Sequence, residues 1–246
     1  EPLGLHFRRI DHKEGPAPYL REYLRRIMMA EKPERADYQE WQGQAYYEDS
    51  LSWENNPLYG WCKKNTKADG SCYDIYTDGL KVYTTINSRM QRYAEEAVRK
   101  HVGGELQPQY KKEKGGSSTY PYSRALSKDE VEKILNKAMR QSDRYRSMKR
   151  GGASEAEIKE AFGTATPMTV FTYQGVKDTV MSPMDSIRYY KSFLRSGMMS
   201  IEPATGHVKA YVGGTDYAHF QYDMCMMGRR QVGSTIKPFV YSLAME

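Results

Sequence analysis

The sequence contains few cysteines and no long apolar run. Three cysteines among 246 residues are too few for a disulfide framework, and none has the spacing of metal ligands. No stretch approaches the roughly 20 apolar residues that a membrane-spanning helix needs, and no cleavable targeting segment opens the chain. We therefore expect no metal and no cofactor, and we expect the chain as given neither to insert into a membrane nor to direct its own export.

The ends of the sequence lack the marks of a complete protein. The chain starts at Glu1 without a methionine and stops at Glu246 inside a predicted helix. We interpret both ends as boundaries within a longer protein, so the absent signals exclude nothing in that protein.

A basic stripe is also absent. The formal net charge is +6 and the mean hydropathy is −0.80, but the charge is scattered along the chain. Nucleic-acid binding needs basic residues gathered on one face. Composition therefore does not support a nucleic-acid partner, and the length allows one large domain or two small ones.

The sequence leaves one disulfide open. Cys62 and Cys72 flank a turn at Asp69-Gly70, and two strands joined there would bring their sulfur atoms together. The pair is equally compatible with free thiols. Cys225, between two methionines, is expected to be a small buried apolar residue.

Residues 1–78 have the pattern of a helix followed by an irregular, aromatic-rich connector. Pro18 can start a helix, and apolar residues from Leu20 to Met28 follow on one face. Three tryptophans and several turn signals then fill residues 38–76.

At Gly79 the pattern changes to that of a sheet domain. Lys81–Ile86 is rich in β-branched and aromatic residues and is predicted to be a strand. Ser88 and Gln91 have the spacing of a capping box, which predicts that a helix starts there. We therefore predict a second domain over residues 79–246, with the domain truncated at its last residue.

A polar, helical insertion is predicted within this domain at about residues 103–165. Gly103–Arg124 is rich in glycine, serine and lysine, a composition that predicts a mobile loop. Two capping boxes, which begin at Ser127 and Ser154, predict short helices after it.

The following segments predict two hairpins with a helix between them. Met168–Met181 is predicted to be a hairpin with its turn at Gly175, Ser182-Pro183 starts the helix, and Gly197–Val212 is the second hairpin. This order of strands and helices predicts an α+β fold, the start of a sheet domain with packed helices.

The stretch from Arg229 to Glu246 carries the candidate chemistry. Ser234 and Lys237 are three residues apart, so on a helix both project from one face. A serine hydroxyl is a weak nucleophile, and a lysine amine takes its proton only when burial or neighbouring cations lower the amine pKa from its usual value of about 10.4. Alone, the Ser-x-x-Lys spacing has low specificity, because about one match occurs by chance in a chain of this length. The same residues also fit a capped surface helix.

The context of the motif favours a catalytic interpretation. Gly233 allows a tight turn before the serine, and Pro238 lies in the first helical turn, where a proline costs little and the helix dipole is positive. An apolar face follows and is expected to be buried behind the motif: Phe239, Val240, Leu243 and Ala244.

Long stretches around the motif match one family in order and spacing. IEPATGHVKAYVGGTDY (residues 201–217) followed by RRQVGSTIKPFVYSLAME (229–246) resembles the start of the transpeptidase domain of penicillin-binding proteins. GLKVYTTINSRMQRYAEEAV (79–98) resembles the strand and helix that open this domain in the bifunctional members, which also carry a glycosyltransferase. HFRRIDHKEGPAPYLREYLR (6–25) is similar to the connector that follows the glycosyltransferase domain.

The resemblance implies a peptidoglycan synthase and gives the two site residues their roles. Ser234 would attack the D-Ala-D-Ala carbonyl of a stem peptide with Lys237 as general base, and β-lactams would acylate the same serine. The implied partners are stem peptides, glycan strands, β-lactams and regulatory proteins of the envelope. The whole protein is expected to be anchored in the bacterial inner membrane and to face the periplasm.

The chain departs from the family pattern, and two alternatives stay open. Val232 stands where the family has a small residue or proline, and the Ser-x-Asn and Lys-Thr/Ser-Gly elements of the family's site do not occur before Glu246. One alternative is a non-catalytic connector and binding module, inactive as this piece of the synthase. The other is a serine β-lactamase, which shares Ser-x-x-Lys but lacks the aromatic connector.

Overall fold

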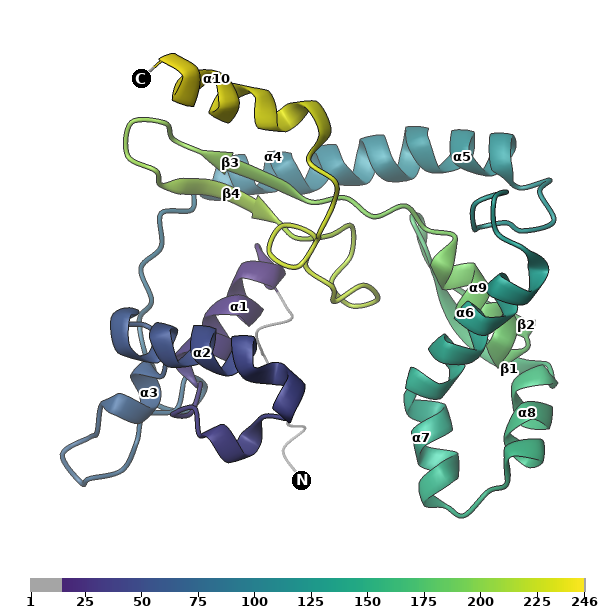
Figure 1. Cartoon of the computed structure of the whole chain (residues 1–246), viewed down its shortest axis with the longest axis horizontal. Helices are drawn as coiled ribbons and strands as arrows, with labels where there is room; N and C mark the ends of the chain where they lie inside the picture. The colour runs from purple at the N-terminus through teal and green to yellow at the C-terminus, as the bar shows by residue number, and fades with distance from the viewer. Residues whose placement is uncertain (1–14, 246) are drawn as a thin grey trace, which may run out of the picture. The chain divides into compact units, whose positions relative to one another are not determined.

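The computed structural model describes residues 15–245, which form two compact units (Figure 1). The first unit contains residues 15–92 and 197–245, and the second contains residues 93–196. Residues 1–14 and Glu246 lie outside the described residues, and with them the first part of the predicted connector.

Short helices make up the N-terminal part of the first unit. They are α1 (Pro18–Met28), η1 (Arg35–Asp37), η2 (Glu40–Gln42), α2 (Gly43–Asn55) and α3 (Trp61–Lys64). The helix predicted from Pro18 is confirmed. Ile27 and Met28 at its end pack with Cys62 of α3 in a buried apolar cluster. The chain enters α3 through Gly60, whose φ of 70° lies in the left-handed region and whose N–H donates to the Ile27 carbonyl at 2.7 Å.

The three cysteines are free thiols, so the disulfide left open by the sequence is not formed. Cys72 pairs with Thr66 in an isolated β-bridge across the expected turn, and it is exposed. Cys62 instead lies on α3 and is 1% exposed. The helix therefore carries one sulfur into the core while the other faces solvent, and burial raises the pKa of the Cys62 thiol.

Lys81–Ile86 is not a strand, and that prediction is wrong. Residues 81–85 are exposed and run beside β4 (Val208–Val212). Two hydrogen bonds join this segment and the next residue to β4 in the described structure, from Thr85 Oγ1 to the Val208 carbonyl at 2.7 Å and from the Asn87 N–H to the Lys209 carbonyl at 2.9 Å. A β-branched composition suits a strand, but a strand also needs a regular ladder with a neighbour.

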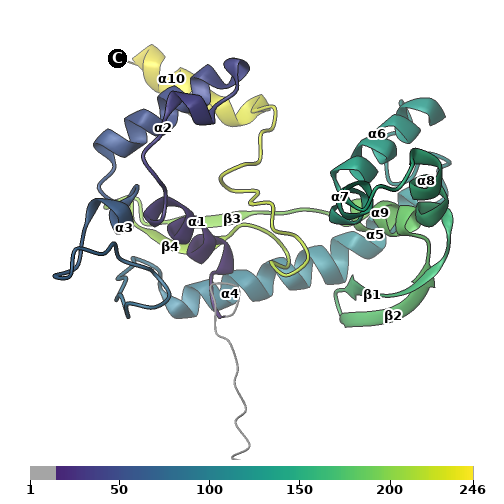
Figure 2. The ribbon, with the colours of Figure 1, turned by 90° about the horizontal axis from the view of Figure 1, so that it is seen from below.

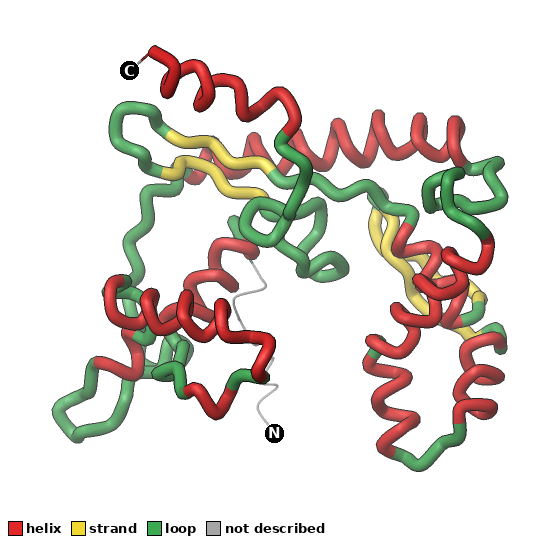
Figure 3. Tube along the Cα trace, viewed as in Figure 1, coloured by secondary structure: helices red, strands yellow, loops and turns green. Residues whose placement is uncertain are grey.

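The predicted hairpin after Gly197 is confirmed. β3 (Met198–Ile201) pairs with β4 in antiparallel register, from Met198 opposite Val212 to Ile201 opposite Val208, with an irregularity at Ser200. The two hairpins of the chain belong to separate two-stranded sheets, drawn in yellow in Figure 3.

The helix α4 (Ser88–Val98) is present, but its N-terminus is not the predicted capping box. Asn87 caps it, because its Oδ1 accepts the backbone N–H groups of Arg89 and Met90 at 3.1 Å. Gln91 is fully buried and bonds to the backbone of β4 instead. Its Nε2 donates to the Tyr211 carbonyl at 2.8 Å, and its Oε1 accepts the Tyr211 N–H at 2.7 Å.

The first half of the predicted loop at Gly103–Arg124 is helical up to Lys114, and residues 115–124 form turns. Residues 88–114 form one continuous helix, in which the π-helical η3 (Arg99–Leu106) links α4 to α5 (Gln107–Lys114) (Figure 2). Gly103 is buried against the ring of Tyr173, where a Cβ would come within 2.3 Å of a ring carbon. The composition prediction failed because contacts distant in sequence order this polar segment.

The start of α5 is fixed by one glutamine. Gln107 donates to the Ser192 carbonyl at 3.0 Å and accepts the Leu194 N–H at 2.8 Å. This pair of bonds ties the helix to the last residues of the second unit.

Three amphipathic helices follow, and the capping boxes predicted at Ser127 and Ser154 are confirmed. The helices are α6 (Lys128–Gln141), α7 (Asp143–Arg150) and α8 (Glu155–Gly163). Ser127 and Glu130 cap α6 reciprocally, as Ser154 and Glu157 cap α8. Met139, Ile158 and Phe162 form the buried cluster between these helices.

The second unit ends with a hairpin and a helix, as predicted. β1 (Thr166–Thr172) pairs with β2 (Gly175–Met181), and α9 (Pro183–Lys191) starts at the N-cap Ser182. Tyr189 of α9 donates its hydroxyl to the Phe171 carbonyl at 2.6 Å, and Tyr190 accepts the Phe171 N–H at 3.1 Å. The mixture of helices and antiparallel hairpins confirms the α+β class. Within residues 15–245, no helix combines the length and apolar character needed to cross a bilayer.

Replacing the buried amide of Gln91 tests how the β3–β4 hairpin is held. Gln91→Leu keeps the side-chain size but leaves the N–H and carbonyl of Tyr211 buried without these partners, so we expect the free energy of unfolding to fall by about 2 kcal/mol. Urea unfolding followed by tryptophan fluorescence measures it, because all three tryptophans lie in the first unit.

Gln109→Leu, an exposed position on α5, is the matched control and should leave the midpoint unchanged. Equal midpoints for wild type and Gln91→Leu would contradict the role assigned to Gln91.

Candidate active site

The structure places Ser234 and Lys237 three residues apart on one helical segment. Ser234 lies in the 3₁₀-helix η4 (Gly233–Ile236), and Lys237 is the first residue of α10 (Lys237–Met245). The backbone N–H of Lys237 donates to the Ser234 carbonyl, so the two residues are one turn apart. Gly233 has a φ of 54°, in the left-handed region that favours glycine, which explains the residue before the serine.

The side chains of the two candidate residues are solvent-exposed. Among the contacts of residues 15–245, none is a hydrogen bond between the Ser234 hydroxyl and the Lys237 ammonium group. The neighbouring Thr235 hydroxyl donates to the Val232 carbonyl at 2.5 Å and closes the turn. The two residues thus have the predicted spacing on a helix, but the Ser234 hydroxyl and the Lys237 ammonium group are not hydrogen-bonded to each other.

The predicted burial of α10 is wrong. Every residue from Gln231 to Met245 is exposed, and the exposed fraction reaches 73% at Phe239 and 76% at Leu243. An amphipathic helix is buried only where a sheet or another helix covers its apolar face. No element within the described residues covers this one, so its apolar side chains remain in water.

The loop before the motif is built on α1. Gly213 and Gly214 follow β4 and lie against the ring of Tyr19, which is 4% exposed. A Cβ on Gly214 would come within 2.2 Å of the Tyr19 hydroxyl oxygen, so only glycine allows this approach. The same hydroxyl donates to the Phe220 carbonyl at 2.5 Å, and the Tyr19 ring meets that of Tyr217 edge-on at 4.9 Å.

Asp223 shapes the next turn of this loop. Its Oδ1 accepts the backbone N–H groups of Cys225 and Met226 at 2.9 and 3.2 Å, and its Oδ2 accepts the Tyr211 hydroxyl at 2.5 Å. Burial and this carboxylate together raise the pKa of Tyr211 far above its usual range. Cys225 is half-buried rather than fully buried, and its thiol donates to the Val212 carbonyl at 3.4 Å.

The sequence prediction missed the residues that support the site. Gln91, Tyr19 and Asp223 hold β4 and the following loop, but the sequence analysis assigned only Gln91, and assigned it to a capping box. Their partners lie up to 201 residues away in the sequence. The signal that pointed nearest to them was the glycine pair at 213–214, which marks a close approach of another element.

An alignment covering 70% of the chain is 29% identical to penicillin-binding protein 1A of Neisseria flavescens, and another is 28% identical to penicillin-binding protein 1A of Escherichia coli strain K12. Residues 117–194 match the family model of the penicillin-binding protein middle domain. The chain is similar to penicillin-binding protein 1A.

The chain spans only part of the length of these relatives. The alignments cover 24% of the Neisseria protein and 23% of the Escherichia protein, so the chain spans about a quarter of their length. Penicillin-binding protein 2D of Bacillus subtilis strain 168 is 27% identical over 52% of the chain and 18% of that relative. No solved structure matches the chain. The resemblance found from the motifs is confirmed, while the family-model match falls within the second unit and not on Ser234 and Lys237.

The described residues contain no cluster of side chains suited to binding a metal ion. In the part of the chain that the structure describes, no three His, Cys, Asp or Glu side chains gather as metal ligands. His219 and Asp216 form a pair, with Nδ1 2.8 Å from the carboxylate, beside the loop that Tyr19 supports.

Adding a methyl group at Gly214 tests the close packing between this glycine and Tyr19. Gly214→Ala places a Cβ in steric overlap with the Tyr19 hydroxyl, and we expect a loss of about 2 kcal/mol in the free energy of unfolding. Combining it with Tyr19→Phe should cost less than the two separate losses added together, because the nearest atom is then removed.

Gly43→Ala, in a helix with no atom within 4 Å of the new Cβ, is the control and should not lower stability. Strict additivity of the two changes at Gly214 and Tyr19 in urea unfolding would contradict this packing.

Proposed function

We propose that the protein to which this chain belongs is a peptidoglycan synthase with a penicillin-sensitive D,D-transpeptidase, in which Ser234 is the nucleophile and Lys237 the general base. The observation that carries the proposal is the Gly-Ser-x-x-Lys-Pro sequence at the start of a helix, with the two side chains one turn apart. The similarity to penicillin-binding protein 1A supports it.

The first step forms an acyl-enzyme. The Ser234 oxygen attacks the carbonyl carbon of the penultimate D-alanine of a stem peptide while its proton moves to the Lys237 amine. The D-Ala-D-Ala peptide bond then breaks, the proton passes to the leaving nitrogen, and D-alanine departs. The positive end of the helix favours the oxygen as negative charge develops on it.

The second step resolves the ester. An amine of a neighbouring stem peptide attacks the acyl carbonyl and loses a proton to the base. The ester bond to Ser234 then breaks, the base returns the proton to the serine oxygen, and a new amide cross-link remains. A β-lactam follows the first step only, because its ring nitrogen stays attached to the acyl group after the lactam bond opens.

The position of Lys237 sets a condition for this chemistry. A lysine acts as a general base when its amine is removed from water, because burial disfavours the charged form. The exposed surface of α10 is therefore expected to be covered in the active enzyme, and covering elements would come from the rest of the synthase.

The remaining activities and partners belong to the same proposal. The synthase would carry a glycosyltransferase domain joined to this chain through the connector at residues 1–78. It would be anchored in the bacterial inner membrane and act on glycan strands and stem peptides at the periplasmic face. Envelope regulatory proteins are candidate partners.

Acylation of the full-length protein tests the nucleophile. We expect a fluorescent penicillin to label the full-length protein, Ser234→Ala to abolish the label, and Lys237→Arg to slow labelling by about 10²- to 10⁴-fold, because a guanidinium does not accept the proton. Labelling is measured by in-gel fluorescence over time.

Ser242→Ala, on the same helix, is the matched control and should label as wild type does. Persistent labelling of Ser234→Ala would place the nucleophile elsewhere. Rapid hydrolysis of nitrocefin by the full-length protein would favour a β-lactamase instead.

The chain of 246 residues should itself react slowly with penicillin. Since Ser234 and Lys237 are exposed and not bonded to each other, we expect acylation at least about 10²-fold slower than in the full-length protein. Intact mass spectrometry of the chain against time measures this rate, with Ser234→Ala as the background.

Acylation of the chain at the full-length rate would contradict the requirement for a covered helix. A full-length protein that is never labelled would instead favour the non-catalytic connector.

A further inference from the structure

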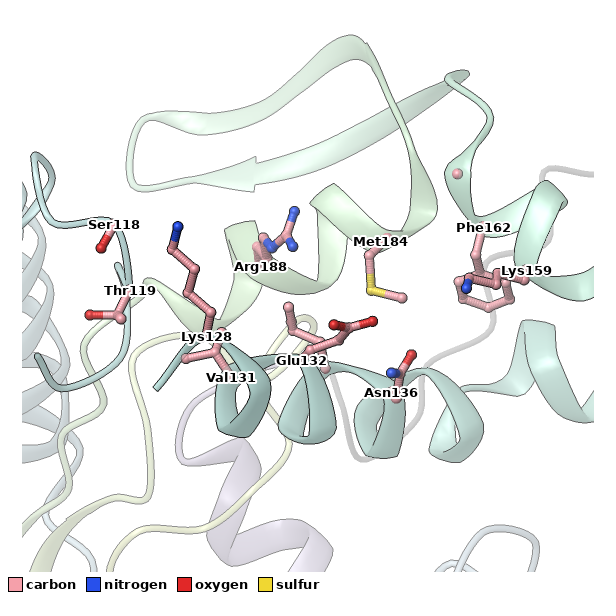
Figure 4. Close-up of a pocket in the computed structure, with 12 residues that line it drawn as sticks. Ser118, Thr119, Lys128, Val131, Glu132, Asn136, Lys159, Phe162, Met184 and Arg188 are labelled. Atoms are coloured by element: carbon pink, nitrogen blue, oxygen red, sulfur yellow. The ribbon is translucent and has the colours of Figure 1, made fainter. Parts of the chain in front are cut away.

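A pocket in the second unit lies apart from the candidate active site. It has a volume of about 440 Å³ and is formed by α6, α8 and α9 together with the segment at residues 118–119 (Figure 4). Its size falls in the range of small-molecule sites, which is about 300–1,000 Å³. All of its lining residues lie within the stretch that matches the middle-domain model.

The floor of the pocket is apolar and firmly packed. Leu135 and Phe162 line it and are each 2% exposed, and Met184 contributes its thioether. Phe162 belongs to the buried cluster between the helices, and Met184 packs against that cluster. The floor is therefore part of the core of the unit, which keeps the pocket open to an apolar group of matching size.

The rim of the pocket is predominantly cationic. Lys128 of α6, Lys159 of α8 and Arg188 of α9 line it, against one carboxylate, that of Glu132. In Figure 4, Lys128 and Arg188 stand toward the end that carries Ser118 and Thr119, and Lys159 stands toward the end with Phe162. Three separate helices thus direct positive charge to one apolar hollow.

The charges of the rim are only partly neutralised. Arg188 pairs with Asp185 at 3.3 Å, which uses one of its five N–H groups. Lys128, Lys159 and Glu132 form no ion pair with any group in residues 15–245. Counting Asp185 with the four rim groups, three positive charges face two negative ones, so the pocket keeps a net positive charge.

A solvated surface does not account for this arrangement. Lysines on helices commonly lay their apolar stems along the surface and keep the ammonium group in water, but here cationic side chains from three helices surround one hollow whose floor is core. Ser118 and Asn136 add neutral hydrogen-bonding groups to the wall. Few polar groups around an apolar floor are the pattern of a ligand site.

We propose that this pocket binds a small organic anion in which a carboxylate or phosphate is attached to an apolar group. The apolar group would lie on Leu135, Phe162 and Met184, and the anion would accept hydrogen bonds from Lys128 and Arg188 or from Lys159. The proposal does not depend on acylation of Ser234, because the pocket lies wholly in the second unit.

The test uses three probes with the same aromatic group and the ¹⁵N-labelled chain. They are N-acetyl-phenylalaninate, benzyl phosphate and the neutral N-acetyl-phenylalanine amide. Amide chemical shifts are followed during titration. We expect at least one anion to bind at about millimolar concentration, about tenfold or more tightly than the neutral amide, and to shift residues of α6, α8 and α9. Comparing the carboxylate probe with the phosphate probe shows which of the two anionic groups the pocket prefers.

Charge reversal on the rim provides the matched comparison. Lys128→Glu and Lys159→Glu lie at exposed positions, so both variants should fold, and at least one should weaken anion binding by about tenfold or more. Lys137→Glu changes the same charge on the opposite face of α6 and should bind as wild type does. Equal affinity for the anions and the neutral amide, shifts confined to other helices, or unchanged binding in both rim variants would overturn the proposal.

Discussion

Two hydrogen bonds between the Gln91 side chain and the backbone of Tyr211 hold the first unit together around its hairpin. β4 has β3 on one side, while the extended segment at residues 81–85 does not pair with it as a strand. The amide takes the place that a strand neighbour would fill and is itself completely buried. From this fixed strand the chain passes through the glycines under Tyr19 to the loop that leads to Ser234. The strand that precedes the loop to Ser234 is therefore fixed by a polar side chain of α4.

At the candidate active site the local helical structure is formed, but the packing that would cover it is not. Gly233, Ser234 and Lys237 adopt the helical start that the chemistry needs, and the backbone alone sets their spacing. The apolar face of α10 and both reactive side chains remain in water. A proton acceptor made from lysine depends on a low-polarity surrounding, so local geometry gives the predicted spacing but not the environment that the proposed chemistry needs. The proposed transpeptidase accordingly requires further parts of the synthase around this helix.

Local signals predicted much of the fold, and contacts between distant residues account for the errors. The capping serines at 127, 154 and 182 and both hairpins follow from short-range preferences, and the structure has them all. Residues 103–114 were mispredicted as a loop because Tyr173 and the backbone near Ser192, more than 60 residues away, order them. Gln91 was wrongly assigned to a capping box because its true partner, the backbone of Tyr211, lies 120 residues away in the sequence. The spacing of Ser234 and Lys237 followed from sequence, whereas the exposure of their helix depends on which elements cover it.

The account of Ser234 is tested most directly by locating the adduct. Full-length protein treated with a penicillin and digested with trypsin should carry the acyl group on the peptide that follows Arg230, and fragmentation of that peptide should assign it to Ser234. Because that peptide also contains Thr235 and Ser242, the fragmentation must resolve each hydroxyl. An adduct on either of these residues, or on a different peptide, would contradict the account.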